Sequence, residues 1–214
     1  MRFRIVLAAF ALTAFVLVWP GWSVGAQDLD AGAVMTRLHA KFDEAGAFSA
    51  HFRQTLDADY ANSSSTIEGT IVLSGDKYRI ETGGQTIVTD GVTTWVYIAE
   101  DQQVIINDFV EDEGSFSPGH FLNERPDQFD ASFADERSRR HYVVLLETRS
   151  ADTYLESATL WIDRKDYTVS RIDVVDVNGA SIRFEMSGID LSAVADESTF
   201  TFEPAEGVEV VDLR

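Results

Sequence analysis

A turn signal lies between two strand-like runs in Ile87-Val-Thr-Asp90-Gly91-Val-Thr-Thr-Trp95-Val-Tyr97. β-Branched and aromatic residues, which favour strands, lie on both sides of the central Asp90-Gly91 pair. Asp-Gly is a strong signal for a two-residue hairpin turn, because glycine adopts the positive φ that such turns need. The stretch therefore predicts two neighbouring antiparallel strands.

The same alternation of short strand-like runs and turns extends in both directions from this hairpin. Gly83-Gly84 marks one further turn, and Asn178-Gly179 marks another hairpin. A sheet of about ten strands tends to curl or close, and residues 142–146 are apolar on both faces. We therefore expect a mainly β fold, an incomplete antiparallel β-barrel whose curved sheet is covered by amphipathic helices. The expected strands are 48–56, 67–73, 78–82, 86–88, 95–98, 104–106, 142–146, 158–162, 169–175 and 182–186.

One amphipathic helix is expected before the first strand. Asp28 or Asp30 caps its start and Gly46 ends it. A helix across the mouth of a curved sheet would enclose an apolar cavity, so we expect this helix to act as a lid. The apolar residues that would seal the mouth recur every four positions, at Val34, Leu38 and Phe42.

Residues 108–139 break the strand pattern. They contain Pro118, Pro126 and many acidic residues, so we expect short helices or loops there. An excursion of this length within a compact domain is usually functional.

The first 26 residues have the pattern of an export signal. Arg2 and Arg4 precede an apolar run that ends at Val18, and Val24-Gly25-Ala26 resembles a cleavage site. The run has about 14 residues, which is short for an uncleaved membrane anchor. We expect cleavage after Ala26, a single domain over residues 27–214, and a location in a bacterial periplasm.

The chain is strongly acidic and has no cysteine. It carries 36 acidic and 17 basic residues, a formal net charge of -19, and loss of Arg2 and Arg4 would make it -21. The missing cysteine excludes disulfides, thiolate metal sites and a cysteine nucleophile. The charge argues against nucleic acid as a partner and against electrostatic docking to anionic lipids. The sequence contains three lysines, Lys41, Lys77 and Lys165. An acid-rich, lysine-poor surface is typical of a salt-adapted host, and a merely acidic protein is the alternative interpretation.

A catalytic serine is not expected. Ser117 lies in a segment that resembles a nucleophile elbow, but the elbow needs glycine where this chain has Ser115. His120 is near in sequence without the spacing of a triad. We therefore expect no enzyme activity.

No metal or cofactor is expected either. The histidines are scattered, without the spacing of metal ligands: His39, His51, His120 and His141. Part of a calcium loop is matched by Asp176, Asn178, Gly179 and Glu185, but its first position is Val174, which cannot ligate. A hairpin at Asn178-Gly179 explains the same residues.

Five segments, in order, resemble the motifs of the LolA family, periplasmic carriers of outer-membrane lipoproteins. They are Phe48-Ser-Ala-His-Phe-Arg-Gln54, Gly75-Asp-Lys-Tyr-Arg79, Ile87-Val-Thr-Asp-Gly-Val-Thr-Thr-Trp-Val-Tyr97, Ser117-Pro118 with Phe121-Leu122, and Ser198-Thr-Phe-Thr-Phe-Glu-Pro-Ala-Glu-Gly-Val208. The resemblance implies an incomplete barrel with a helical lid and an apolar cavity for acyl chains. It also implies shuttling from an inner-membrane ABC transporter to outer-membrane lipoprotein acceptors, by a protein we expect to be a monomer.

One position departs from the family pattern. Many members carry an Arg-Pro pair that latches the lid, where this chain has Ser74-Gly75. The latch therefore cannot be transferred to this sequence.

The residues expected to line the cavity are the apolar side chains of the expected strands and of the proline-led segment. They are Phe52, Ile71, Tyr78, Ile80, Trp95, Tyr97, Phe121, Leu122, Phe184 and Met186. Alternation along the strand places Ile182, Phe184 and Met186 on one face. A periplasmic lipid- or glycolipid-binding module, or an envelope-stress sensor, on the same fold is the alternative function.

Overall fold

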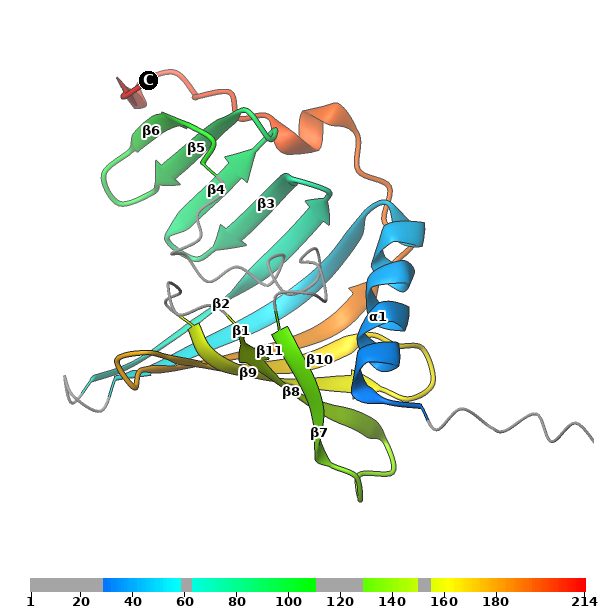
Figure 1. Ribbon diagram of the computed structural model, residues 1–214. Helices are drawn as coiled ribbons and strands as arrows, with labels where there is room; N and C mark the ends of the chain where they lie inside the picture. Colours follow the sequence, from blue (N-terminus) through cyan, green and yellow to red (C-terminus); the bar gives the residue numbers. More distant parts are fainter. Residues whose placement is uncertain (1–28, 59–62, 111–128, 150–154) are drawn as a thin grey trace, which may run out of the picture.

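The computed structural model describes residues 29–58, 63–110, 129–149 and 155–214 (Figure 1). These residues form one 12-stranded sheet in the order β12-β6-β5-β4-β3-β2-β1-β11-β10-β9-β8-β7. Neighbouring strands are antiparallel except β12 and β6, which are parallel. The strands are β1 (Phe48–Ala58), β2 (Ser63–Ser74), β3 (Lys77–Thr82), β4 (Gln85–Thr89), β5 (Thr93–Ile98), β6 (Gln103–Asp108), β7 (Phe129–Asp135), β8 (His141–Thr148), β9 (Leu155–Asp163), β10 (Val169–Asp176), β11 (Ser181–Asp190) and β12 (Glu209–Asp212).

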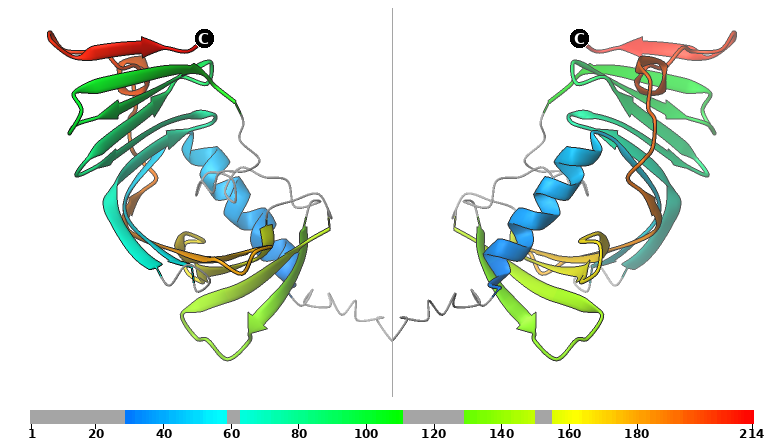
Figure 2. Two further views of the ribbon diagram at one scale, coloured as in Figure 1. Left: turned by 90° about the vertical axis from the view of Figure 1, so that its left-hand side faces the viewer. Right: turned by 90° about the vertical axis from the view of Figure 1, so that its right-hand side faces the viewer.

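The sheet is strongly curved but does not close, because its edge strands β12 and β7 do not pair with each other (Figure 2). Gly69 in β2 permits a close approach of β3. A Cβ atom at Gly69 would lie 2.1 Å from the Glu81 carbonyl oxygen and 3.0 Å from Cε1 of Phe52. Any side chain there would push β3 away, so glycine is needed at this close approach.

The helix α1 (Ala31–Ala45) lies inside the curve of the sheet (Figures 1 and 2). The Asp30 carboxylate caps it by accepting a hydrogen bond of 2.7 Å from the Ala33 amide, and Gly46 ends it with a φ of 69°. Val34 and Leu38 are fully buried. The predicted amphipathic helix is therefore confirmed.

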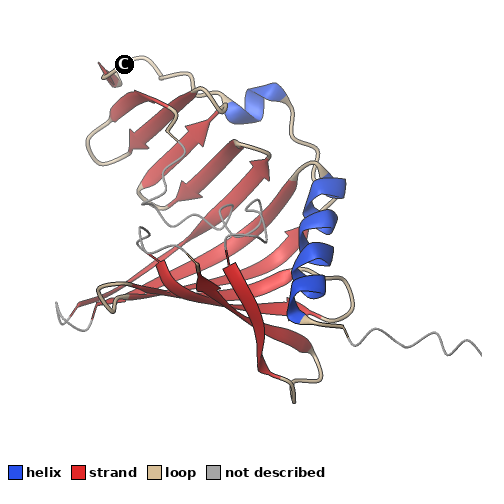
Figure 3. Cartoon of the chain, in the orientation of Figure 1, coloured by secondary structure: helices blue, strands red, loops and turns tan. Residues whose placement is uncertain are grey.

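The prediction of a curved, mainly β fold is confirmed, and the prediction of several covering helices only in part. Figure 3 shows α1 and the short 3-10 helix η3 (Glu197–Phe200) as the helices of the described residues. The helix predicted beside Pro118 lies outside them. The expected loop or helix is wrong for residues 129–135, which form the edge strand β7. Apolar residues at every second position, Phe129, Ala131 and Phe133, explain why a strand forms there.

The buried face of the sheet changes from one half to the other. On β1, β2 and β7–β11 the apolar side chains point into the curve, where they form one core with α1. On β4 and β6 the buried side chains Val88 and Val104 have no exposed surface and lie outside that core. Residues 191–208 cover this second cluster on the convex side. Phe200 is buried there, and the Phe202 ring stacks on Tyr97 at 5.5 Å.

Candidate functional site

The concave face of the sheet is a continuous apolar surface. Paired residues of antiparallel strands share a face, so the pairs Phe52–Met186, Ala50–Ile71 and Ile172–Phe184 define one side of four strands, β1, β2, β10 and β11. Its members are buried between the sheet and α1. They include Phe48, Ala50, Phe52, Ile71, Leu73, Val144, Leu146, Ala158, Leu160, Ile162, Ile172, Val174, Phe184 and Met186.

The apolar stripe of α1 fills the space above this surface. Val34, Met35, Leu38 and Phe42 belong to the same core, and the Phe42 ring meets the Phe48 ring edge-on at 4.9 Å. Helix and sheet thus bury each other's apolar face. Removing α1 would expose a large hydrophobic surface, which is costly unless another apolar group replaces the helix.

A polar contact fastens the middle of α1 to the turn between β9 and β10. Arg37 donates a hydrogen bond of 2.6 Å to the Tyr167 hydroxyl, and its guanidinium lies 5.5 Å from the centre of that ring. Tyr167 has a φ of 59° and stacks on Tyr142 at 5.9 Å. Burial and the hydrogen bond with Tyr167 raise the pKa of the Tyr142 hydroxyl, while Arg164 acts in the opposite direction. The contact ties the helix to the aromatic side chains of the sheet.

A second contact holds the C-terminal end of α1. The Ser74 hydroxyl donates a hydrogen bond of 2.8 Å to the carbonyl oxygen of Gly46, the residue that ends the helix. The motif resemblance places Ser74 at the position of the arginine that latches the lid. This position therefore still contacts the end of the helix, through a hydroxyl in place of a guanidinium.

The structure places most of the expected cavity residues on the concave face and two of them on the convex face. Ile71, Tyr78 and Ile80 share the concave face with Phe52, Phe184 and Met186. Trp95 and Tyr97 point to the convex face, because Trp95 pairs with the buried residue Val88 and Tyr97 stacks on Phe202. Phe121 and Leu122 lie outside the described residues.

Sequence reasoning missed several concave residues on the half of the sheet that carries β12. They are Ile87, Val96, Ile105 and Val211, each half-buried. The available signal was the alternation around the Asp90-Gly91 hairpin, which puts Val96 on the opposite face from Trp95 and Tyr97.

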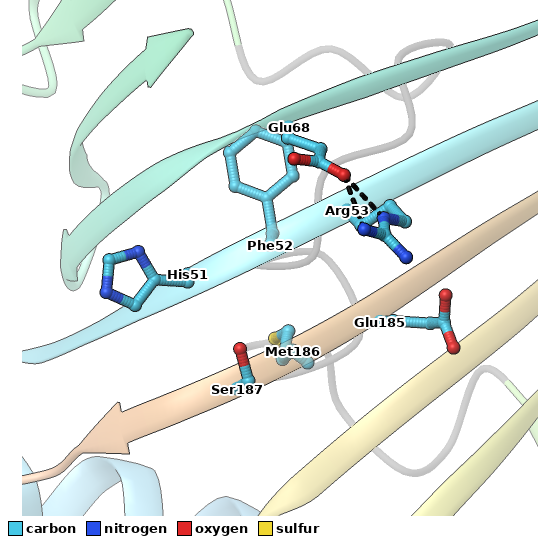
Figure 4. A pocket seen from close by; sticks show the side chains of 7 residues that line it. All are labelled: His51, Phe52, Arg53, Glu68, Glu185, Met186 and Ser187. Carbon is cyan, nitrogen blue, oxygen red and sulfur yellow. Dashed lines mark hydrogen bonds and ion pairs between the residues drawn. The ribbon is translucent and has the colours of Figure 1, made fainter.

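A pocket of about 310 Å³ lies near the centre of the sheet (Figure 4). It is lined by His51, Phe52, Arg53, Glu68, Glu185, Met186 and Ser187. Arg53 and Glu68 form an ion pair of 2.6 Å across β1 and β2, and five of the seven residues alternate with the concave ones. The pocket is thus mainly polar and differs in character from the apolar surface under α1.

The convex face of β10 and β11 carries a charged network. Asp173 accepts hydrogen bonds from Arg171 and, at 3.0 Å, from Arg183. Burial alone would raise the pKa of the Asp173 carboxyl, but the two guanidinium groups outweigh it and lower this pKa. This face is therefore polar and ionised where the concave face behind it is apolar.

Neither metal chemistry nor a membrane span is indicated in the described ranges. They contain no group of three side chains that could hold a metal ion, and α1 is not long and apolar enough to cross a bilayer. Asp176 accepts hydrogen bonds of 2.8 Å from the amides of Asn178 and Ala180, and Gly179 has a φ of 81°. The partial calcium motif is thus a hairpin turn.

Fold and site together define a class of β-proteins in which a helix covers the apolar inner face of an open half-barrel. The profile of the family described as "Outer membrane lipoprotein carrier protein LolA" matches residues 43–203. The chain belongs to this family, which confirms the resemblance found in the motifs.

Individual relatives agree with this assignment. The chain is 31% identical over 128 residues to an outer-membrane lipoprotein carrier protein from Halorhodospira halophila, which covers 60% of this chain and 59% of that protein. It is 25% identical over 181 residues to one from Aeromonas salmonicida, covering 83% of this chain and 88% of the relative. The crystal structure of an uncharacterized conserved protein from Thermus thermophilus shares the fold, with a TM-score of 0.54 at 12% identity, over 84% of this chain and 96% of that one.

Proposed function

We propose that this protein is a periplasmic carrier that binds the acyl chains of lipoproteins and shuttles them from the inner to the outer membrane. The observation that carries the proposal is the continuous apolar concave face, buried by the apolar stripe of α1. Each methylene moved out of water gains about 0.8 kcal/mol, so acyl chains need such a cover while they cross an aqueous space.

Full loading requires α1 to lift from the sheet, so that acyl chains lie between its apolar stripe and the concave face. Leu38 and Val34 are fully buried against the concave face, so the helix occupies the surface that the chains would use. Exchanging one apolar partner for another leaves the free energy nearly balanced. Arg37 and Ser74 are the polar contacts that would have to yield or rearrange.

Family membership and the export signal predicted from the sequence support the proposed partners. Outer-membrane lipoproteins would be the cargo, an inner-membrane lipoprotein-releasing ABC transporter the donor, and an outer-membrane protein the acceptor. The carrier would act as a monomer and would make or break no covalent bond, which agrees with the absence of a catalytic motif from the sequence.

Substituting Leu38 by glutamate tests the proposal. Leu38 is fully buried on the apolar stripe, so a carboxylate there should prevent α1 from packing over acyl chains. Ala40→Glu is the matched control, because it adds the same charge at an exposed position of the same helix. The two variants and the parent are mixed with a purified triacylated lipoprotein, and co-elution is measured by gel filtration.

We expect the parent and Ala40→Glu to form the complex and Leu38→Glu to lose it, with the β-sheet signal in circular dichroism unchanged. Normal loading of Leu38→Glu would refute the role of α1 as the cover. Mass spectrometry of what copurifies from the native periplasm separates the functions: triacylated proteins support a carrier, and free glycolipids instead support a glycolipid-binding module or sensor.

A further inference from the structure

A straight row of aliphatic side chains crosses the half of the concave face that carries β12. Strand pairing sets Ile80 beside Ile87, Ile87 beside Val96, Val96 beside Ile105, and Ile105 beside Val211. We call these five residues the aliphatic stripe. The row continues through the pair Ile71–Ile80, and Ile71 is part of the core with α1. The stripe thus joins that core to the sheet edge.

The stripe is only half-buried, unlike the rest of the apolar core. All five residues keep part of their surface accessible, whereas Ile71 is 1% exposed. The convex side of the same strands is packed, since Val88 and Val104 are fully buried there. Ile80 still packs against the core with α1, whereas Ile87, Val96, Ile105 and Val211 belong to neither core and remain partly accessible on the concave side.

Polar residues border the stripe for most of its length. On one side its neighbours on the same face are Tyr78, Thr89, Thr94 and Asn107, and on the other side they are Thr82, Gln85, Ile98, Gln103 and Glu209. Tyr78 and Ile98 are the exceptions, and on β4 and β6 the stripe is one side chain wide. Gln103 donates a hydrogen bond of 3.1 Å to Glu209 within that border. An amphipathic helix or a protein interface needs a broader apolar surface than this.

The length of the stripe also restricts the ligand. Ile80 and Val211 are separated by four strand spacings, from β3 to β12, or about 19 Å. This is the length of a long saturated acyl chain in its extended form. The ligand that fits is therefore narrow, apolar and straight.

We propose that the aliphatic stripe is the binding site of one saturated acyl chain, which lies perpendicular to the strands from Ile80 to the edge strand β12. This proposal rests on the proposed carrier function and adds to it. The site is accessible while α1 remains packed, so a first acyl chain binds here without displacing the helix.

Photo-crosslinking with a palmitic acid that carries a diazirine at its tail tests the site directly. The parent protein is loaded, irradiated and digested, and the labelled peptides are mapped by mass spectrometry. We expect labels on β4, β5 and β6, at or beside Ile87, Val96 and Ile105, and unlabelled palmitic acid should compete. This measurement needs no variant.

Val96→Thr provides the energetic test. It keeps the shape of a β-branched residue but places a hydroxyl under the chain, so the affinity for palmitic acid should fall about tenfold. Val72→Thr is the matched control: the same exchange in β2, at a half-buried position on the convex face beside Arg79. It should leave the affinity unchanged, and both variants should melt close to the parent.

The outcomes separate the two proposals. Labels confined to the core between α1 and the sheet, such as Leu38 or Leu160, with normal affinity of Val96→Thr, would overturn the stripe site and leave the carrier function standing. A change of oligomeric state in Val96→Thr would also overturn the stripe site, because it would identify a protein partner or a second copy as the ligand. Failure of the parent to bind either palmitic acid or a triacylated lipoprotein would overturn both.

Discussion

Replacing Gly69 by alanine should destabilise the sheet where β3 comes closest to β2. The added Cβ would lie 2.1 Å from the Glu81 carbonyl oxygen, and this atom belongs to the backbone of β3 and cannot rotate away. The second contact, 3.0 Å to Phe52, involves the edge of a ring that can shift a little. Relief therefore requires β3 to move, and overpacking of this kind costs about 3 kcal/mol.

Such a loss corresponds to a fall in melting temperature of about 6–12 °C for a domain of this size. Thermal unfolding followed by circular dichroism measures it, and urea unfolding with an unchanged m-value shows that the denatured state is not responsible. Gly83→Ala is the matched control, since a Cβ there has nothing within 4 Å and the residue is not in the left-handed region. It should change the stability by less than about 0.5 kcal/mol. If Gly69→Ala melted with the parent, the close approach of β2 and β3 would be wrong.

Three further predictions concern the charged and polar contacts. Asp173→Asn should lower stability at neutral pH, because the pKa of the Asp173 carboxyl is lowered in the folded state. Urea unfolding should show that the difference in stability from the parent shrinks as the pH falls below about 4. A difference that stays constant with pH would contradict the network with Arg171 and Arg183. Tyr167→Phe removes the acceptor of the Arg37 hydrogen bond but keeps the ring stacked on Tyr142. Amide hydrogen exchange should therefore become faster in α1 and stay the same in the sheet. Unchanged exchange in α1 would show that this hydrogen bond does not hold the helix. If the acidic, lysine-poor surface reflects a salt-adapted host, the melting temperature should rise from low to multimolar KCl, and no rise would reject the idea.

Local patterns in the sequence are sufficient to predict α1 and the hairpins. Val34 and Leu38 are four residues apart, and a helix puts such residues on one face whatever surrounds it, so their burial could be expected. Asp90-Gly91 and Asn178-Gly179 each mark a turn in which glycine has a positive φ, of 85° and 81°. The expected two-residue loop is wrong, because the pairs that close these turns are Thr89–Thr94 and Val175–Ser181, which leave longer loops.

The face to which a strand residue points could not be predicted in the same way. Alternation shows that Trp95 and Tyr97 share a face, but which face is inside depends on distant parts of the chain. Residues 191–208 pack on the convex side and bury Phe200 there, so large aromatic residues on β5 serve a second core. The contact between Arg37 and Tyr167 joins residues 130 positions apart and leaves no local signal.

The covering of the convex side by residues 191–208 has a consequence for how the chain folds. β12 pairs with β6 through residues such as Gln103 and Glu209, which are 106 positions apart, and pairings over such separations form slowly. During synthesis β3–β6 are complete long before their cover exists, so Val88 and Val104 face water in every shorter nascent chain. A chain truncated before residue 191 would therefore expose apolar surface on β3–β6 and be prone to aggregate. The last part of the chain thus decides whether the newly made protein is protected from aggregation.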